Sequence, residues 1–375
     1  MAGIYIHIPY CTQACHYCDF HFSTNLKSKS ELINCLVKEL SLQNNYLEKE
    51  TVESIYFGGG TPSLLTLSEV ELILSSITQH HQISEEAEIT LEANPENITA
   101  EVLAGYHSLG VNRLSVGIQS FNNDYLRLMN RIHTAEEATR SIRMIHESPI
   151  KDFSLDLIFG IRPGEIDQWH RDLSLATDLE PPHISVYNLT IEEKTAFGHW
   201  HKKGLIKELD DGESAECFEL AHHLLTAQGY EHYEISNYGK SHIAVHNSSY
   251  WKGDKYLGIG PGAHSFNGKS RQFNIRNNAT YIRHLQSEQI PATVEKLSRN
   301  DLINEHIMTG LRTIWGCDVK HLKANYNYDL MCEKKEEINT FEEAGLLVLS
   351  ENSIVLTLKG QLLADTICLE LMTSA

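Results

Sequence analysis

The sequence predicts an α/β protein built on a parallel sheet, with a smaller helical domain toward the C-terminus. Through the first two-thirds of its 375 residues, short apolar runs alternate with longer amphipathic stretches. Strand, helix and strand in this order favour right-handed crossovers and parallel pairing. The six strands found in this way are fewer than the eight of a closed (β/α)8 barrel. We therefore expect an incomplete barrel or an open parallel sheet.

The elements of this core follow one another at a steady interval. The predicted strands are residues 4–8, 54–57, 88–91, 113–116, 153–158 and 184–187. The predicted helices between them are residues 32–47, 67–79, 101–109, 135–146 and 168–179. In the predicted helices, apolar residues recur at the spacing of one helix face. In the predicted strands, they form short continuous runs.

The pattern changes after about residue 200. Residues 212–228 predict a helix that ends at Gly229, and residues 230–235 predict a strand. From Asp301 the chain is helical in pattern, and two short β runs around 351–352 are followed by a last helix, as in a winged-helix module. We accordingly divide the chain into a core at 1–200, an extension at 201–295 and a winged-helix-like domain at 296–375.

Composition limits the classes of function. The chain has 31 basic and 50 acidic residues, a formal net charge of −19. Non-specific nucleic-acid binding needs a basic surface, so we expect no nucleic acid as partner, even for the winged-helix-like domain. No apolar run has the length of a membrane span, and the first residues lack the regions of a secretory signal. We expect a cytoplasmic protein, with peripheral membrane contact through partners left open.

Three of the eight cysteines, Cys11, Cys15 and Cys18, are spaced C-x3-C-x2-C after the first predicted strand. Structural zinc requires four ligands, and here only His16 or His21 is near enough in sequence to be the fourth. An iron–sulfur cluster is the other common use of clustered thiolates. A cubane held by three cysteines keeps one iron open to a small molecule. The cluster is the favoured interpretation, with zinc as the alternative.

Polar and glycine residues recur near the same end of successive predicted strands. Glycines at the end of the second strand allow a ligand to approach the backbone, and Arg131 is a fixed cation able to pair with a carboxylate. In parallel α/β proteins, ligands bind at the carboxyl ends of the strands. The residues expected at this ligand site are Gly59, Gly60, Thr61, Glu92, Gln119 and Asp156.

Seven segments spread over most of the chain together resemble one family. They are IYIHIPYC, YFGGGTPSLL, LEANPE, RLSVGIQSFN, NRIHT, SLDLIFGIRPG and YLGIGPGAHSF. With the cysteine spacing, they resemble the oxygen-independent coproporphyrinogen III oxidase-like family of the radical S-adenosylmethionine superfamily. The resemblance implies an incomplete (β/α)6 barrel of the radical SAM type.

The resemblance also implies the cofactors and the residues that hold them. Cys11, Cys15 and Cys18 would ligate a [4Fe-4S] cluster whose open iron takes S-adenosylmethionine. The cofactor supplies the reactivity, and the protein supplies geometry. The residues implied for S-adenosylmethionine are Tyr5, Gly59, Gly60, Thr61, Glu92, Gln119, Arg131 and Asp156.

Two differences from the oxidases and one further motif indicate which members of the family the chain resembles most. The oxidases carry a further cysteine two residues after the third, where this chain has Phe20, and they have a longer segment before the cluster. The segment HNSSYW, at 246–251, instead resembles the HNxxYW pattern of HemW-type haem chaperones. Neutral imidazole is a good axial ligand for haem iron, so His246 becomes a candidate haem ligand.

The favoured interpretation is thus a haem chaperone that carries a [4Fe-4S] cluster with S-adenosylmethionine and delivers haem to respiratory proteins. The alternatives are radical oxidative decarboxylation of coproporphyrinogen III, or another radical reaction. A homodimer remains open. Whether the chain is an enzyme is not decided by its sequence.

Overall fold

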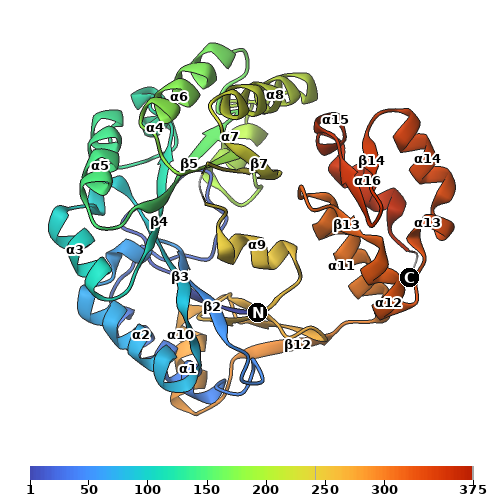
Figure 1. The fold of residues 1–375 in the computed structure, drawn as a ribbon. Helices are drawn as coiled ribbons and strands as arrows, with labels where there is room; N and C mark the ends of the chain where they lie inside the picture. Colours follow the sequence, from blue (N-terminus) through green and yellow to red (C-terminus); the bar gives the residue numbers. More distant parts are fainter. Residues whose placement is uncertain (241, 374–375) are drawn as a thin grey trace.

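The computed structural model describes residues 1–240 and 242–373. Its centre is a curved sheet whose strand order is β12-β11-β10-β9-β1-β2-β3-β4-β5-β6-β8-β7 (Figure 1). Neighbours from β1 to β6 pair in parallel, which confirms the predicted incomplete barrel. These strands are β1 (Ala2–Ile8), β2 (Val52–Gly59), β3 (Ile83–Ala93), β4 (Arg113–Gln119), β5 (Asp152–Phe159) and β6 (His183–Asn188).

Helices cover the outer face of this curve (Figure 1). Thr66 and Thr134 begin two of them with capping boxes, in which a glutamate three residues on returns the hydrogen bond. The helices and one-turn 3-10 segments are α1 (Lys29–Leu42), η1 (Pro62–Leu64), α2 (Leu67–His80), η2 (Pro95–Asn97), α3 (Ala100–Ser108), α4 (Asn123–Leu128), α5 (Ala135–Glu147) and α6 (Ile166–Asp178).

One predicted helix, residues 32–47, is too long. The helix ends at Leu42, and the following residues form turns. Asn44 and Asn45 are poor helix formers because their side chains compete for backbone hydrogen bonds. Leu47 is nevertheless buried in the main core, which explains why its apolar side chain extended the predicted pattern.

The extension completes both edges of the sheet. The predicted helix at 212–228 and strand at 230–235 are confirmed as α8 (Asp211–Ala227) and β7 (Glu231–Glu234). The sequence did not predict that β9 (Lys255–Ile259) would pair in parallel with β1, as a seventh parallel strand. The other elements are α7 (Ala196–Lys202), β8 (Asn237–Gly239), α9 (Val245–Trp251), β10 (His264–Phe266), β11 (Ser270–Asn274), α10 (Asn278–Gln286) and β12 (Ala292–Lys296).

The C-terminal part lies to one side of the sheet and has its own buried apolar cluster (Figure 1). A three-stranded sheet, in the order β13-β15-β14, packs with helices, as expected for a winged-helix-like module. The domain boundaries at 200 and 295 stay a prediction. The elements are α11 (Arg299–Leu311), β13 (Cys317–Asp318), α12 (Val319–Tyr326), α13 (Leu330–Glu333), α14 (Lys335–Glu343), β14 (Leu347–Leu349), β15 (Ser353–Leu356), α15 (Leu358–Gln361) and α16 (Ala364–Leu371).

A buried carboxylate joins the extension to the core. Glu39 of α1 is fully buried, and its oxygens accept hydrogen bonds from Asn274 Nδ2 at 2.7 Å and Gly260 N at 2.9 Å. Gln43 Nε2 donates at 2.8 Å, and the hydroxyl of Tyr281 also donates. Burial raises the pKa of Glu39 to about 7. The four donors come from the C-terminal end of α1, where Gln43 is the cap, from α10 and from the β9–β11 region, so one side chain holds these elements together.

Replacing this carboxylate should destabilise the fold. Glu39→Leu leaves several buried donors without an acceptor, and we expect it to lower the free energy of unfolding by roughly 3 kcal/mol or more. Urea unfolding followed by circular dichroism measures the change. Glu71→Leu is the matched control, because Glu71 is an exposed carboxylate on α2, and it should change stability by less than about 0.5 kcal/mol. Equal losses in both variants would contradict this account.

Candidate functional site

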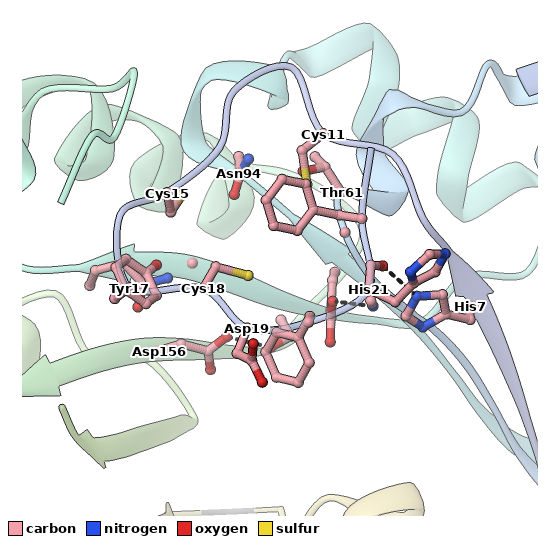
Figure 2. A pocket seen from close by; sticks show the side chains of 18 of the residues that line it. His7, Cys11, Cys15, Tyr17, Cys18, Asp19, His21, Thr61, Asn94 and Asp156 are labelled. Atoms are coloured by element: carbon pink, nitrogen blue, oxygen red, sulfur yellow. Dashed lines mark hydrogen bonds between the residues drawn. The ribbon is translucent and has the colours of Figure 1, made fainter. Parts of the chain in front are cut away.

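A pocket of about 890 Å³ opens at the carboxyl ends of the parallel strands (Figure 2). Its wall is formed by the loop after β1 and by the ends of β2 to β6. The structure therefore brings together, around one cavity, every residue that the sequence predicted for the cluster and for S-adenosylmethionine. These residues are Tyr5, Cys11, Cys15, Cys18, Gly59, Gly60, Thr61, Glu92, Gln119, Arg131 and Asp156.

Several hydrogen bonds hold the loop that carries the three cysteines. Cys11 N donates to the carbonyl of Ser23 at 3.1 Å. Gln13 Nε2 donates to the carbonyl of Asn130 at 2.9 Å, and Asn130 Nδ2 donates to that of Ala14 at 2.7 Å. These bonds hold the loop against the turn after α4, so the three half-buried thiols are presented to the cavity from a fixed backbone (Figure 2).

The structure does not favour the zinc alternative. His16 Nδ1 is 2.8 Å from the carbonyl of Leu128, and His21 Nε2 is 2.7 Å from Asn278 Oδ1. Each histidine is bonded through one ring nitrogen and keeps the other, so these bonds do not decide between zinc and a cluster. The three cysteine sulfurs, however, are not gathered within 4.8 Å of one another, which is wider than one tetrahedral ion requires. Three spaced thiols suit a larger multi-iron ligand better.

Burial affects the protonation of the cysteine thiols, and one arginine places a positive charge beside them. Burial raises the pKa of Cys11 and raises that of Cys18 to about 12, so both thiols hold their protons until a metal replaces them. Arg131 Nη1 lies 3.6 Å from the sulfur of Cys15. Its Nη2 donates to Asn94 Oδ1 at 2.7 Å and to the Gly117 carbonyl at 2.9 Å. The guanidinium is thus a fixed positive charge beside the thiol loop.

Two half-buried acids, Glu92 and Asp156, face the same cavity. Tyr56 OH donates to Glu92 Oε1 at 2.9 Å and Gly59 N donates to Oε2 at 3.1 Å, while burial raises the pKa of Glu92 to about 7. Ser115 Oγ donates to Asp156 Oδ2 at 2.7 Å, and burial raises the pKa of this acid also. Asp156 Oδ1 is buried without a hydrogen-bond partner. A buried acceptor with no donor is suited to a ligand hydroxyl or ammonium group.

The backbone conformation explains why glycines occupy positions 59 and 60 and how the side chain of Gln119 is oriented. Gly59 has φ +110°, and a Cβ there would come within 2.4 Å of the His7 ring. A Cβ on Gly60 would come within 2.8 Å of the Ile8 carbonyl oxygen. Gln119 has φ +68°, and the pairing of β4 with β5 is irregular between Gly117 and Gln119. A bulge at this point re-aims the side chain at the end of the strand toward the pocket.

Several residues that line the pocket were not predicted from the sequence. Tyr56 and Ser115 support the two acids. Each stands four residues before a predicted site residue, Gly60 and Gln119 respectively. His264 and Arg276 enter from the extension, after the strand that was not predicted. The glycine-rich segment at 258–262 was the available signal for a strand end beside β1.

His246 does not line the main pocket. It lies on α9, inside the curve of the sheet (Figure 1). It borders a smaller cavity of about 190 Å³, whose wall shares Tyr5, Tyr56, Ser115, Tyr187 and Tyr250 with the main pocket. Its Nδ1 is 2.8 Å from Ser54 Oγ and its Nε2 is 2.9 Å from Tyr250 OH. Burial lowers its pKa to about 4. Axial ligation by His246 stays a prediction, and in this conformation neither ring nitrogen is open to a metal.

Comparison with known proteins connects this geometry to families. Residues 5–176 match the radical SAM superfamily, and residues 297–363 match the HemN C-terminal domain. "Heme chaperone HemW" of Bacillus subtilis (strain 168) is 31% identical over 98% of both chains. The Escherichia coli (strain K12) protein of that name is 39% identical over 70% of this chain and 69% of its own. The structure of Escherichia coli coproporphyrinogen III oxidase (HemN) has a TM-score of 0.85 and 21% identity, covering 99% of this chain and 90% of that one.

A radical SAM domain implies a [4Fe-4S] cluster and S-adenosylmethionine, and the residues of the pocket fit both. Three spaced thiols beside a fixed cation suit a cluster with an open iron, as Arg131 compensates thiolate charge. The unpartnered oxygen of Asp156 and the half-buried Glu92 suit the hydroxyl and ammonium groups of the small molecule. Within residues 1–240 and 242–373, none of the helices has the length and hydrophobicity of a membrane span.

Loss of any one cysteine of the loop should abolish the cluster. We expect Cys11→Ser, Cys15→Ser and Cys18→Ser each to reduce bound iron and sulfide, and the visible absorption of the reconstituted protein, to background. Cys332→Ser is the matched control, because Cys332 is an exposed thiol far from the loop in sequence, and it should retain full iron content. Retention of the cluster in all three loop variants would contradict the assignment.

Binding of S-adenosylmethionine should depend on the ionisation of Glu92. Because burial raises the pKa of Glu92 to about 7, its carboxylate forms only as pH rises through that value. Affinity for the positively charged ligand should therefore increase between about pH 6 and pH 8, measured by calorimetry on the reconstituted protein. Glu92→Gln should weaken binding roughly tenfold and flatten this dependence. Glu71→Gln serves as the control, and a slope that survives in Glu92→Gln would exclude Glu92 as its source.

Proposed function

The chain belongs to the HemW family of radical SAM proteins, and from this premise we propose that it is a haem chaperone, which binds haem and delivers it to haem-requiring respiratory proteins. The observation that carries the proposal is similarity to a "Heme chaperone HemW" along 98% of both chains. The pocket supports it, because the residues at the strand ends suit the implied cofactors and leave an open mouth for a larger molecule.

Part of the pocket wall is apolar. Phe20, Phe22, Ile132 and Leu189 line it, and Phe20 and Ile132 are 73% and 45% exposed. A large aromatic side chain exposed at a cavity rim commonly marks a surface that an apolar ligand or partner covers. A porphyrin ring is such a ligand.

We assign the predicted residues as follows. Cys11, Cys15 and Cys18 hold the [4Fe-4S] cluster. Arg131 compensates their charge, and Glu92 and Asp156 accept hydrogen bonds from S-adenosylmethionine. The remaining contacts of that ligand are Tyr5, Gly59, Gly60, Thr61 and Gln119. We further propose a cytoplasmic location, haem-accepting respiratory proteins as partners, and a homodimer as the form to be tested first.

The alternative function is oxidative decarboxylation of coproporphyrinogen III. The similarity to the oxidase structure concerns the fold, since the two sequences are 21% identical. The oxidase pattern has a fourth cysteine where this chain has Phe20, and the side chain of Phe20 has no metal-ligating atom. We therefore do not assign this activity to the chain.

The proposal predicts haem binding without decarboxylation. Protein reconstituted with its cluster under anaerobic conditions should bind about one haem per chain in a titration followed by the Soret band, and should transfer it to an apo-haemoprotein. The same preparation, given S-adenosylmethionine and a one-electron reductant, should release no carbon dioxide from coproporphyrinogen III. Failure to bind haem would refute the chaperone function, and stoichiometric carbon dioxide release would establish the alternative.

A further inference from the structure

The protein has 21 histidines, and an imidazole that ligates haem iron must be accessible and have a free ring nitrogen. In this conformation both ring nitrogens of His246 are hydrogen-bonded. His7 lines the main pocket, but its ring nitrogens lie 3.1 Å from Tyr5 OH and 2.9 Å from the His21 carbonyl. His21 bonds Asn278 through Nε2 alone. An imidazole with both ring nitrogens free must therefore be sought elsewhere around the cavities.

A second cavity, of about 640 Å³, adjoins the main pocket. His264 and Arg276 line both cavities, so the two are continuous at these side chains. Half of the residues that line the second cavity lie in the antiparallel strands β10, β11 and β12. The others lie on the chain between β11 and β12, including His284 of α10. We call it the strand groove. Its residues are His264, Phe273, Asn274, Ile275, Arg276, His284, Ile290, Pro291, Ala292 and Thr293.

Strand pairing gives this groove a continuous face. His264 is paired with Phe273 across β10 and β11, and Phe273 is paired with Thr293 across β11 and β12. Residues paired directly across strands project to the same face of a sheet. The rings of His264 and Phe273 accordingly lie 5.7 Å apart at 30°. Phe273 is 37% exposed, so the aromatic wall is available to a flat ligand.

The rest of the wall is apolar and open. Ile275 and Ile290 are 39% and 40% exposed, and Pro291 and Ala292 lie beside them. Such neighbouring apolar side chains are costly to leave in water, at about 25 cal/mol for each Å². A large, flat, apolar molecule would cover them in a way that a small polar metabolite would not.

His264 is free to ligate. Across residues 1–240 and 242–373, no hydrogen bond to either of its ring nitrogens is present, and its side chain is partly exposed. Partial burial, together with Arg276 and Arg271, lowers the pKa of His264 below its ordinary value. The imidazole is therefore neutral near pH 7, which is the form that binds iron.

Arg276 supplies a positive charge at the junction of the two cavities. It is exposed and forms no ion pair with a residue in the described part of the chain. Its side chain passes over Gly262, where a Cβ would lie 3.1 Å from Arg276 Cγ, and Gly262 has φ +79°. In a chain of net charge −19, an unpaired guanidinium beside an apolar wall suits a ligand that carries carboxylates on an apolar body.

We propose that an iron porphyrin binds in the strand groove, with His264 as an axial ligand, Phe273 against the ring and Arg276 paired with a propionate. The inference rests on the proposed chaperone function, since it names where haem would be held. It places haem at the mouth of the cofactor pocket rather than at the motif on α9. His284 forms part of the wall and is not the assigned ligand.

The test compares three histidines in the full-length, cluster-loaded protein. Ferric haem is titrated into wild type, His264→Ala, His284→Ala and His246→Ala, following the Soret band and the electron paramagnetic resonance spectrum. His264→Ala should weaken binding roughly tenfold or more and lose the signature of imidazole ligation, and added imidazole should restore that signature. His284→Ala should stay within about twofold of wild type. Iron content and S-adenosylmethionine binding should be unchanged in His264→Ala, which would show that the variant is folded.

A second variant tests the propionate contact. Arg276→Ala should weaken haem binding severalfold, whereas haem dimethyl ester, which lacks the carboxylates, should bind wild type and Arg276→Ala equally. Haem binding that is unaffected by His264→Ala, or that is lost with His284→Ala or His246→Ala instead, would overturn the groove assignment while the chaperone function stands. Absence of haem binding by the wild-type protein would overturn both.

Discussion

The site depends on one constraint, the parallel pairing of β1 to β6 in a register that brings their carboxyl ends to a common edge. Ile8 at the end of β1 pairs with Gly59 at the end of β2, and Gly117 of β4 pairs with Asp156 of β5. Residues as far apart in sequence as Cys11 and Asp156 therefore meet around one cavity. Gly59 and Gly60 lie close to β1 because neither has a Cβ. The packing of the sheet therefore requires these glycines whether or not a ligand is bound.

Electrostatics follow from this enclosure. Glu92 and Asp156 are half-buried at the strand ends, and burial raises the pKa of both. Arg131 is fixed beside Cys15 by the side chain of Asn94 and by the carbonyl of Gly117, the strand neighbour of Asp156. The pocket thus combines a fixed positive charge beside the thiol loop with two acids that hold their protons. A metal cluster at the thiols and a small molecule that presents ammonium and hydroxyl groups to the acids would complement both.

Much of this arrangement could be predicted from the sequence, because it is local or periodic. The strands of the core are apolar runs bounded by turns, and their final polar residues, such as Glu92 and Asp156, stand out against them. The remainder depends on contacts that are distant in sequence. β9 is five residues long with a glycine inside it, and nothing near it shows that it pairs with β1 rather than with its neighbours. His264 and Arg276 reach the pocket only because of that pairing. His246 was predicted from a motif, and the motif does not reveal that Ser54 and Tyr250 occupy its ring nitrogens.

The placement of β9 also bears on how two ligands can share one protein. Because β9 lies beside β1, the strands that follow it carry His264 and Arg276 to the rim of the cofactor pocket, while Phe273 and Ile275 face the strand groove. The cluster loop reaches the same rim from the other side of β1. A molecule in the groove and a molecule in the pocket would then contact the same two side chains, so binding of one changes the surroundings of the other. Equilibrium linkage requires such an effect to be reciprocal. With haem in the strand groove as proposed, the fold would provide a direct physical route between the cofactor pocket and the haem site.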